Sequence, residues 1–424
     1  MIDRRSFLAG LTLPATLGSL GCLDPERASL CLARARAAED DADFWSEIAR
    51  AFTVDRSIVN LNNGGVSPAP AFVQEAMKRY LDFSNGAPPH TMWRVLEPER
   101  ETVRQRLARF AGVDAEEIAL TRNASEGLQI CQFGFDLEPG DEVLATNQDY
   151  PRMINTFKQR ERREGIRLVQ FSIPTPCEDP EEIVRLYEEH ITDRTRLILI
   201  SHVVFLTGQI LPVKEVCALG QRRGIPVIVD GAHAFAHVDF RIGDLDCDYY
   251  ATSLHKWLAA PHGTGLLFVR RDRIPSLWPL MAAPEERKDD IRKFEEIGTH
   301  PAANTLGASE ALTFHEGIGS TRKFDRLVEL RNFWAHRLLE NDRVRLHTSL
   351  DPRFSGAIAN MEIEGVDSTA LYSWLWREHR ILVTVIRHEE FQGIRVSPSV
   401  YTTFEELERF CDAIEFVLRE GLPG

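Results

Sequence analysis

A lysine follows an apolar run in the segment ATSLHKW (residues 251–257). The residues that lead into it, DCDYYATS, are typical of a buried β-strand, and Lys256 comes just after that strand should end. A buried ammonium group is costly unless its neighbours make use of it. A lysine amine in such a place can lose its proton and form an imine with an aldehyde. Lys256 is therefore a candidate for covalent catalysis.

An aspartate ends another apolar strand, in VIVDGAHA (227–234). A buried carboxylate such as that of Asp230 needs a cation or several hydrogen-bond donors to stay ionised. Two further interpretations are open from the residues alone. Asp230 can be a structural residue that holds the turn, or it can form a metal site with His233 and His237. We disfavour the metal site because no acid is placed as the base of an HExxH-type motif.

Small polar residues mark two segments that could bind a phosphate. The first is TRNASEG (121–127), a strand-to-helix junction where backbone N–H groups and the Ser125 hydroxyl would face an anion. Asn123 or Ser125 could equally be a simple helix N-cap. The second is the Gly-Thr turn before a helix in EIGTHPAAN (296–304). Neither segment identifies a ligand by itself.

Taken together, these features fit one ligand, pyridoxal 5'-phosphate (PLP). The PLP aldehyde needs an amine, which Lys256 supplies, and the ring nitrogen needs a carboxylate, which Asp230 supplies. Tyr150, in NQDYPRM, follows a strand and offers an aromatic face to the ring. The phosphate is expected at a helix start and at the hydroxyls of Ser125, Ser253 and Thr299.

The segment DCDYYATSLHKWLAAPHGTGLLFV resembles the lysine-attachment signature of the class V aminotransferase family of fold-type I PLP enzymes. From LNNGGVSP to FEELERFCDAI the chain is similar to the isopenicillin N epimerase-like branch of that family. Leu254 stands where the family usually has a small residue, which alters the packing beside His255. The resemblance implies an α/β fold, with a mostly parallel seven-stranded sheet in a large domain and a smaller α+β C-terminal domain.

The resemblance also implies roles for single residues around the cofactor. Lys256 would be the Schiff-base lysine, Asp230 the partner of the ring nitrogen, and His233 a neighbour of the phenolic oxygen. Tyr150 would stack on the ring. The phosphate would be bound by the backbone of Ala124 and by the side chains of Ser125, Ser253 and His255.

Three more residues receive roles at the edge of the implied site. Arg395, in GIRVSPSVYTTFEEL, would grip the substrate α-carboxylate; without the family context it reads as an exposed strand-end arginine. His90, in PPHTMW, would contact the same carboxylate, unless it is an ordinary loop histidine. Thr299 would reach the phosphate of the neighbouring subunit's cofactor, which implies a homodimer with shared active sites.

Alternating strand and helix patterns must position these residues. The alternating strand-like and helical runs predict a mostly parallel sheet covered by helices. A long helical stretch (303–341) and an amphipathic helix (404–418) follow. We expect a signal peptide at 1–37, an N-terminal segment at 38–95, a large PLP-binding domain at 96–274, and a dimer-contact helix with a small C-terminal domain at 275–424. The strand-like runs are 117–122, 141–147, 166–173, 195–204, 225–232, 247–254 and 264–270, and the earlier helical runs are 98–110, 180–190 and 213–223.

The first residues, DRRSFLAGLTLPATLGSLGC, resemble a twin-arginine export signal because Arg4 and Arg5 precede Phe and Leu and a mildly apolar run. The alternative is a frayed, slightly basic N-terminus. Export by the twin-arginine translocase would place the protein in the periplasm. Cleavage could follow Ala37, whereas Cys22 in SLGC offers a weak lipoprotein-like site.

Composition excludes some classes of function. The net charge of −14 leaves no basic excess to neutralise phosphates, so we do not expect a general nucleic-acid binder. No apolar stretch reaches the length of a membrane span. The charge and the ordinary content of hydrophobic residues fit a soluble enzyme with local positive sites.

The implied substrate is an amino acid or a small molecule that carries one. Aminotransferase-like chemistry is the first expectation, and an epimerase or a C–S lyase is the alternative, because these reactions share their first steps. Cysteine desulfuration needs a mobile thiolate, yet residues 380–397 contain no cysteine, and Cys411 falls on an apolar helix face. A catalytically silent PLP-binding protein is the alternative from another class.

Overall fold

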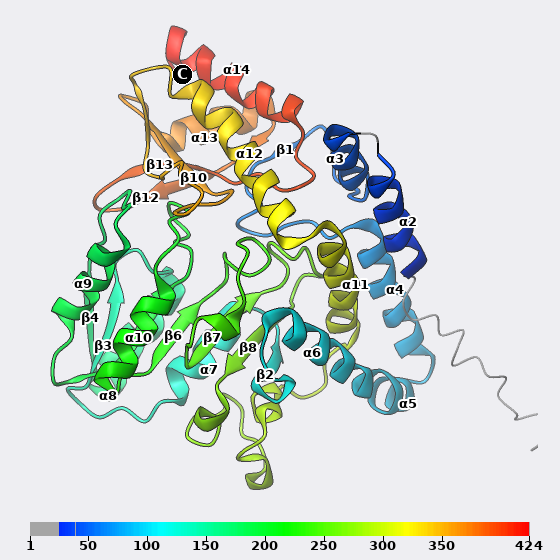
Figure 1. Ribbon diagram of the computed structural model, residues 1–424, viewed down its shortest axis with the longest axis vertical. Helices are drawn as coiled ribbons and strands as arrows, with labels where there is room; N and C mark the ends of the chain where they lie inside the picture. The colour runs from blue at the N-terminus through cyan, green and yellow to red at the C-terminus, as the bar shows by residue number, and fades with distance from the viewer. Residues whose placement is uncertain (1–24, 39, 424) are drawn as a thin grey trace, which may run out of the picture.

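A computed structural model describes residues 25–38 and 40–423 of the chain. Arg4, Arg5 and Cys22, on which the export prediction rests, lie outside these residues. A seven-stranded sheet forms the centre of the large domain (Figure 1). In spatial order its strands are β2 (Ile118–Thr121), β8 (Gly265–Val269), β7 (Tyr249–Ser253), β6 (Val227–Asp230), β5 (Thr195–Ser201), β3 (Glu142–Thr146) and β4 (Arg167–Phe171).

This sheet is parallel except at one strand. β8 pairs antiparallel with both β7 and β2, whereas the pairs from β7 through β6, β5 and β3 to β4 are all parallel. All seven strands correspond to the strand-like runs of the sequence, so the predicted mostly parallel sheet is confirmed. Because β2, β3, β5, β6 and β7 run the same way, their carboxyl ends meet at one edge of the sheet.

Helices cover both faces of the sheet, and alternate strand residues point to opposite faces. Ile198 and Ile200 of β5 belong to the same hydrophobic core as α6 (Glu97–Ala111), α9 (Pro180–His190) and α10 (Val213–Arg223). Leu197 and Leu199 belong to a separate core with α7 (Ala124–Gly134) and α8 (Pro151–Glu164). Burial on both faces explains why these strands read as nearly unbroken apolar runs.

The C-terminal domain has its own sheet and its own core. Its antiparallel sheet has the order β12 (Thr384–Arg387), β13 (Gln392–Val396), β10 (Ala359–Ile363) and β9 (Val344–Leu346). The helices α12 (Ser320–Leu338), α13 (Ser368–His379) and α14 (Phe404–Glu420) pack on it. A short parallel pair, β1 (Val59–Asn60) with β11 (Ile381–Leu382), joins the N-terminal segment to this domain.

The helical stretch expected at 303–341 is not one helix. It divides into α11 (Ala303–Ile318) and α12, because Gly319 adopts φ +93° and ψ +139° between them. In Figure 1, α11 lies beside α4 (Ala71–Gly86) and α2 (Pro25–Arg36), while α12 continues into the C-terminal domain. Among the described residues no helix has the length and apolar character needed to cross a membrane.

The two domains meet at the loop that follows β5, residues 202–212. Thr348 donates a hydrogen bond to the Thr207 carbonyl (2.6 Å), and Ile210 N–H donates to Phe354 O (2.8 Å). Gly208 has φ +79°, and a Cβ atom there would lie 2.2 Å from the carbonyl oxygen of Ile358. A glycine is therefore required both by its backbone conformation and by the close approach of the C-terminal domain.

The first prediction concerns this contact between the domains. Gly208→Ala should lower the free energy of unfolding by about 2–4 kcal/mol, because it adds a steric overlap to the cost of a left-handed backbone. Gly224→Ala is the matched control: Gly224 has φ +68° with no atom near its would-be Cβ, so about 1 kcal/mol is expected. Urea unfolding measures both losses. Equal losses would contradict the overlap.

Candidate active site

A cavity of about 410 Å³ opens at the shared carboxyl edge of the parallel strands. Both domains line it: Thr384 and Arg395 come from the C-terminal domain, and Asn62 from the N-terminal segment. The structure brings all but two of the predicted site residues to this cavity, namely Ala124, Ser125, Tyr150, Asp230, His233, Ser253, His255, Lys256 and Arg395. The carboxyl edge concentrates all of them except Arg395, because each ends a strand or follows one; Arg395 comes from β13 of the C-terminal sheet.

Lys256 lies in the turn after β7, and its Nζ is 3.1 Å from Nε2 of His233. Burial lowers the pKa of the Lys256 amine to about 8; the nearby Asp230 carboxylate raises it and Arg395 lowers it further. Burial lowers the pKa of His233 well below its ordinary value, so this imidazole is neutral. The neutral ring can accept a hydrogen bond from the amine. A larger fraction of Lys256 than of an ordinary lysine is thus uncharged near neutral pH.

Asp230 ends β6, where its Oδ1 accepts a hydrogen bond from the Ala232 backbone (3.0 Å). Burial raises the pKa of the Asp230 carboxyl, and the Ala232 hydrogen bond and Lys256 oppose this effect. A positively charged group beside Asp230 would therefore keep it ionised. Gly231 follows because a Cβ there would lie 2.0 Å from the ring of Tyr250. Asp230 thus supplies a buried carboxylate, and Gly231 leaves room for the Tyr250 ring.

The start of α7 lies at the place where the sequence predicts a phosphate cradle. Asn123 caps this helix by accepting a hydrogen bond from Glu126 N–H (2.9 Å), so the N-cap interpretation is correct for Asn123. Ser253 Oγ accepts from Ala124 N–H (2.9 Å), which joins the end of β7 to the helix start. Ser125 lies in the first helical turn and faces the cavity. An anion here meets backbone N–H groups, hydroxyls and the helix dipole.

His255 is oriented by a backbone carbonyl. Its Nδ1 lies 3.0 Å from Thr264 O, so Nδ1 must carry a proton and donate it. Burial lowers the pKa of His255 to about 4. The neutral ring therefore presents the lone pair of Nε2, and this atom can donate to a phosphate only after taking up a proton. The phosphate role that the resemblance implies for His255 thus requires protonation.

His237 is not available as a metal ligand. Its Nδ1 donates to the His233 carbonyl (2.7 Å), and its Nε2 accepts from the Ala357 backbone (2.8 Å). Both ring nitrogens are engaged, which removes the Asp230–His233–His237 metal site from consideration. Among the residues that the structure describes, His233 Nδ1 is buried and has no hydrogen-bond partner. A ligand in the cavity can supply one.

Arg395, on β13, forms the opposite end of the cavity. Its Nη1 donates to Phe205 O (2.8 Å), and its Nη2 donates to Asn62 Oδ1 (2.9 Å) and Thr384 Oγ1 (3.4 Å). Burial lowers the pKa of its guanidinium to about 10, so it stays charged at neutral pH. No carboxylate of the described chain pairs with it, and its Nε is buried without a partner. An anionic ligand would complete this site.

His90 and Thr299 do not line this cavity within one chain. His90 is exposed at the end of α5 (Pro88–His90). Thr299 lies at a separate hollow that is also lined by Trp93 and His300. The role predicted for Thr299 requires a second subunit, so it stays a prediction, as does the homodimer.

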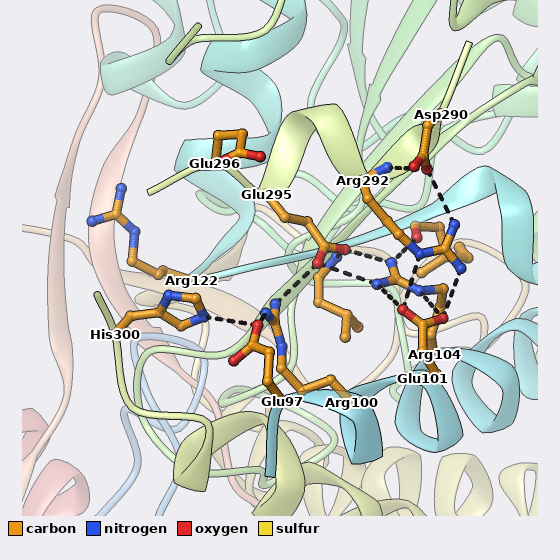
Figure 2. A network of polar contacts seen from close by, with 12 residues as sticks. Glu97, Arg100, Glu101, Arg104, Arg122, Asp290, Arg292, Glu295, Glu296 and His300 are labelled. Atoms are coloured by element: carbon orange, nitrogen blue, oxygen red, sulfur yellow. Dashed lines mark hydrogen bonds and ion pairs between the residues drawn. The ribbon is translucent and has the colours of Figure 1, made fainter. Parts of the chain in front are cut away.

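A network of arginines and glutamates anchors the segment before Thr299 (Figure 2). Glu295 lies between Arg100 (3.0 Å) and Arg104, and it also accepts a hydrogen bond from the Leu120 backbone of β2 (2.7 Å). Arg292 forms an ion pair with Glu101 (2.7 Å). Hydrogen bonds from Arg292 lower the pKa of Glu101 to about 2, against the effect of burial. The sequence analysis missed this network because it joins two segments, residues 97–104 and 290–296, that lie far apart in the chain.

Asp149 does not line the cavity but supports residues that do, and the sequence did not reveal this role. It accepts hydrogen bonds from the backbone and hydroxyl of both Ser201 (3.0 and 2.7 Å) and Thr146 (2.7 and 2.9 Å). It thereby ties the ends of β3 and β5 together beside Tyr150. The Tyr150 ring meets Phe205 edge to face, with centroids 5.2 Å apart. The only signal was its place next to Tyr150 at a strand end.

Asn62 and Thr384 were also missed. Asn62 lies in the turn-rich segment LNNGGVSP, which the sequence marked without assigning a role, and Thr384 begins an edge strand. Both side chains touch Arg395 and are brought to it by the pairing of β12 with β13 and by the bridge between Asn62 and Ser397. The only sequence signal for these two residues was the abundance of polar residues near Asn62.

Comparisons with known proteins show what this chain is similar to. The sequence profile described as Aminotransferase class-V matches residues 59–410. The chain is 30% identical to isopenicillin N epimerase of Streptomyces clavuligerus, over 89% of this chain and 99% of that protein. It is 31% identical to isopenicillin N epimerase of Amycolatopsis lactamdurans, over 88% and 98%.

Two solved structures share the fold. A cysteine desulfurase from Escherichia coli superposes with a TM-score of 0.77 at 19% identity, over 89% of this chain and 98% of that chain. A C-DES mutant with glycine covalently linked to its PLP cofactor superposes with a TM-score of 0.76 at 23% identity, over 86% and 97%. At these identities the likeness concerns the fold.

The second prediction concerns the Lys256 amine. Competitive acetylation followed by peptide mass spectrometry reports the neutral fraction of this amine as a function of pH. The reactivity should rise with pH through a midpoint of about 8, rather than the 10.5 of an ordinary lysine. Asp230→Asn should move the midpoint to lower pH, because the carboxylate favours the ammonium form. A midpoint near 10.5 would show that the amine is not desolvated.

Proposed function

The chain belongs to the aminotransferase class-V family, whose cofactor is PLP, and from this premise we propose that it is an amino-acid epimerase. Its substrate is an amino acid or a small molecule with a free α-amino group and α-carboxylate. The observation that carries the proposal is the pairing of a desolvated amine, Lys256, with a buried guanidinium, Arg395, that has no carboxylate partner in the described chain.

The residues present fit PLP on three counts. Asp230 is buried at the end of β6 and has no ion-pair partner in the described chain, so its carboxylate can pair with a cationic ring nitrogen. The start of α7 with Ser253 offers a phosphate site. Lys256 supplies an amine that is easily deprotonated. When PLP is bound there it withdraws electrons from the substrate, so that the Cα proton becomes acidic.

The carboxylate end of the site orients the substrate. The guanidinium of Arg395 is held at Nη1 by Phe205 O and at Nη2 by Asn62 and Thr384. A substrate carboxylate that binds there meets a charge already fixed in place, so little side-chain entropy is lost. Holding the carboxylate fixes where Cα lies relative to the Lys256 amine.

Few groups in the cavity are free to move the Cα proton. Of the titratable residues that line it, Asp230 is committed to the ring nitrogen, His255 to the phosphate and Arg395 to the carboxylate. Lys256 can take the proton as a neutral amine, and His233 lies within hydrogen-bond distance of it. Tyr150 adds a hydroxyl from a different strand end.

The names of the relatives favour epimerisation over the other outcomes. Two isopenicillin N epimerases align along nearly their whole length, and epimerisation needs only removal and return of one proton. Transamination, the first expectation from the sequence, and C–S cleavage begin with the same proton transfer. They are therefore the alternative outcomes of the experiment below.

Cysteine desulfuration has little support from this cavity. None of the cysteines in the described part of the chain lines it. Burial raises the pKa of the Cys131, Cys217, Cys247 and Cys411 thiols, so they are poor nucleophiles. The likeness to a desulfurase structure therefore extends to the fold and not to a reactive thiol.

The third prediction tests the reaction. The protein, loaded with PLP, is incubated in D₂O with separate L- and D-amino acids and short peptides. We expect deuterium at Cα together with appearance of the opposite stereoisomer, read by mass spectrometry and chiral chromatography. A keto acid without the stereoisomer indicates transamination, and a released thiol indicates a lyase; either outcome refutes epimerisation.

Two variants accompany this measurement. Lys256→Ala should abolish both deuterium incorporation and the visible absorption of lysine-bound PLP, because no other amine is placed in the cavity. Lys214→Ala, which changes an exposed lysine of α10, should leave both unchanged. Borohydride reduction and peptide mapping should place the pyridoxyl group on Lys256. A label on another lysine would overturn the site.

We also propose that the protein is exported, and that processing leaves α2 in place. Within α2, Leu32 and Ala35 are buried, and Arg36 donates a hydrogen bond to Gly317 O of α11 (3.3 Å). Cleavage after Ala37 would remove these contacts and uncover Gly317, against which Leu32 packs. This packing supports a cleavage site before residue 25.

The fourth prediction concerns this export. In a host with a twin-arginine translocase, the protein should appear in the periplasm, and replacing Arg4 and Arg5 by lysine should keep it in the cytoplasm. The N-terminal peptide of the exported form should still contain residues 25–36. A mature chain that begins at residue 38 would refute the argument from α2 packing.

A further inference from the structure

The turn that carries Lys256 has an unusual set of hydrogen bonds. The carbonyls of residues 254 to 256 all accept from backbone N–H groups, those of Ala260, Ser67 and Ala259 in that order, each at 3.1 Å. The next carbonyl, that of Trp257, accepts instead from the side chain of Lys323. A buried carbonyl needs a partner. At this point the partner comes from α12, far along the chain.

Lys323 is buried in the first turns of α12 and is not used by the chemistry described above. Its Nζ also lies 3.4 Å from His315 Nδ1 of α11, and His315 Nε2 lies 3.2 Å from Ser320 Oγ. No carboxylate in the described chain forms an ion pair with it. Burial lowers the pKa of Lys323 to about 7. Burying an amine costs free energy of folding unless its N–H groups make hydrogen bonds inside the protein.

The indole of Trp257 makes no hydrogen bond among the described residues, since its Nε1 is buried without a partner. The indole is held by packing instead. It stacks on the His237 ring, with centroids 3.9 Å apart and planes at 17°. His237 is itself fixed between His233 O and Ala357 N–H. The ring and the carbonyl of Trp257 are thus held from two directions.

We propose that Lys323 is a positioning residue for Lys256. Its hydrogen bond to the Trp257 carbonyl fixes the turn that presents the Lys256 amine to PLP, and it couples the start of α12 to the cofactor. The proposal rests on Lys256 being the residue that binds PLP. It adds a residue from outside the cavity to the machinery that sets where the amine lies.

Loss of this donor has two consequences for the turn. The Trp257 carbonyl is left buried without a partner, which favours a shift of the backbone toward some other donor. Ala259, two residues later, has φ +58°, a left-handed conformation that persists only while its surroundings hold it. Both effects displace the adjacent Lys256, and a small misplacement of a reacting group is costly.

The fifth prediction compares Lys323→Met with Arg331→Met. Methionine keeps most of the side-chain volume but donates no hydrogen bond. Arg331 is a matched control: it is a buried cation of the same helix that donates to Ser349 O (3.1 Å) and Leu350 O (2.8 Å), away from the cavity. Both variants should lose thermal stability. Only Lys323→Met should raise the Kd for PLP, by about tenfold or more, and shift the pH midpoint of the absorption of lysine-bound PLP.

Three outcomes are decisive. If Lys323→Met matches Arg331→Met in both the Kd for PLP and the pH midpoint, Lys323 is only structural and the proposal is wrong. If the unaltered protein shows no lysine-bound PLP, the proposed function itself fails, which is a separate result. If Lys323→Met does not fold, Lys323→Leu and Arg331→Leu, which likewise donate no side-chain hydrogen bond, are compared by the same two measurements, and an equal response of the pair overturns the proposal.

Discussion

The desolvation of a few charged groups is the constraint on which the rest of this structure depends. Lys256 is half-buried, Asp230 and Arg395 are buried, and desolvation disfavours the charged form of each. None of them has a partner of opposite charge at ion-pair distance in the described chain. A protein tolerates such an arrangement when a ligand supplies the missing charges and hydrogen bonds. An aldehyde, a cationic ring nitrogen and a carboxylate match these three groups in turn.

The sheet accounts for two of these groups, and the sequence was sufficient to find them. Lys256 and Asp230 each follow an apolar run, and parallel strands bring the ends of such runs to one edge. Six of the seven strands are buried on both faces, which leaves a nearly continuous apolar signature; the edge strand β4 is partly exposed. Arg395 was different, because nothing in its own segment distinguishes it from a surface arginine. Its role came from the family resemblance, and the structure then placed it at the cavity.

Other features were beyond single-sequence reasoning because they depend on contacts between distant segments. Asn62 reaches Arg395 only because the N-terminal segment pairs with the C-terminal domain. Asp149 acts through Thr146 and Ser201, on two different strands. The break between α11 and α12 at Gly319 was missed, since glycines inside a helical pattern are often tolerated, as Gly317 is within α11. Lys323 looked like one more charged residue of an amphipathic helix.

The loop between β5 and α10 has a consequence for how this fold can be recombined. Its carbonyls hold side chains of the C-terminal domain: Phe205 O binds Arg395, Leu206 O binds Asn360 and Thr207 O binds Thr348. The loop belongs to one domain by sequence and to the other by its bonding. A chimera that takes its C-terminal domain from a relative would have to take residues 202–212 from the same parent, or its carboxylate-binding arginine would arrive without its support.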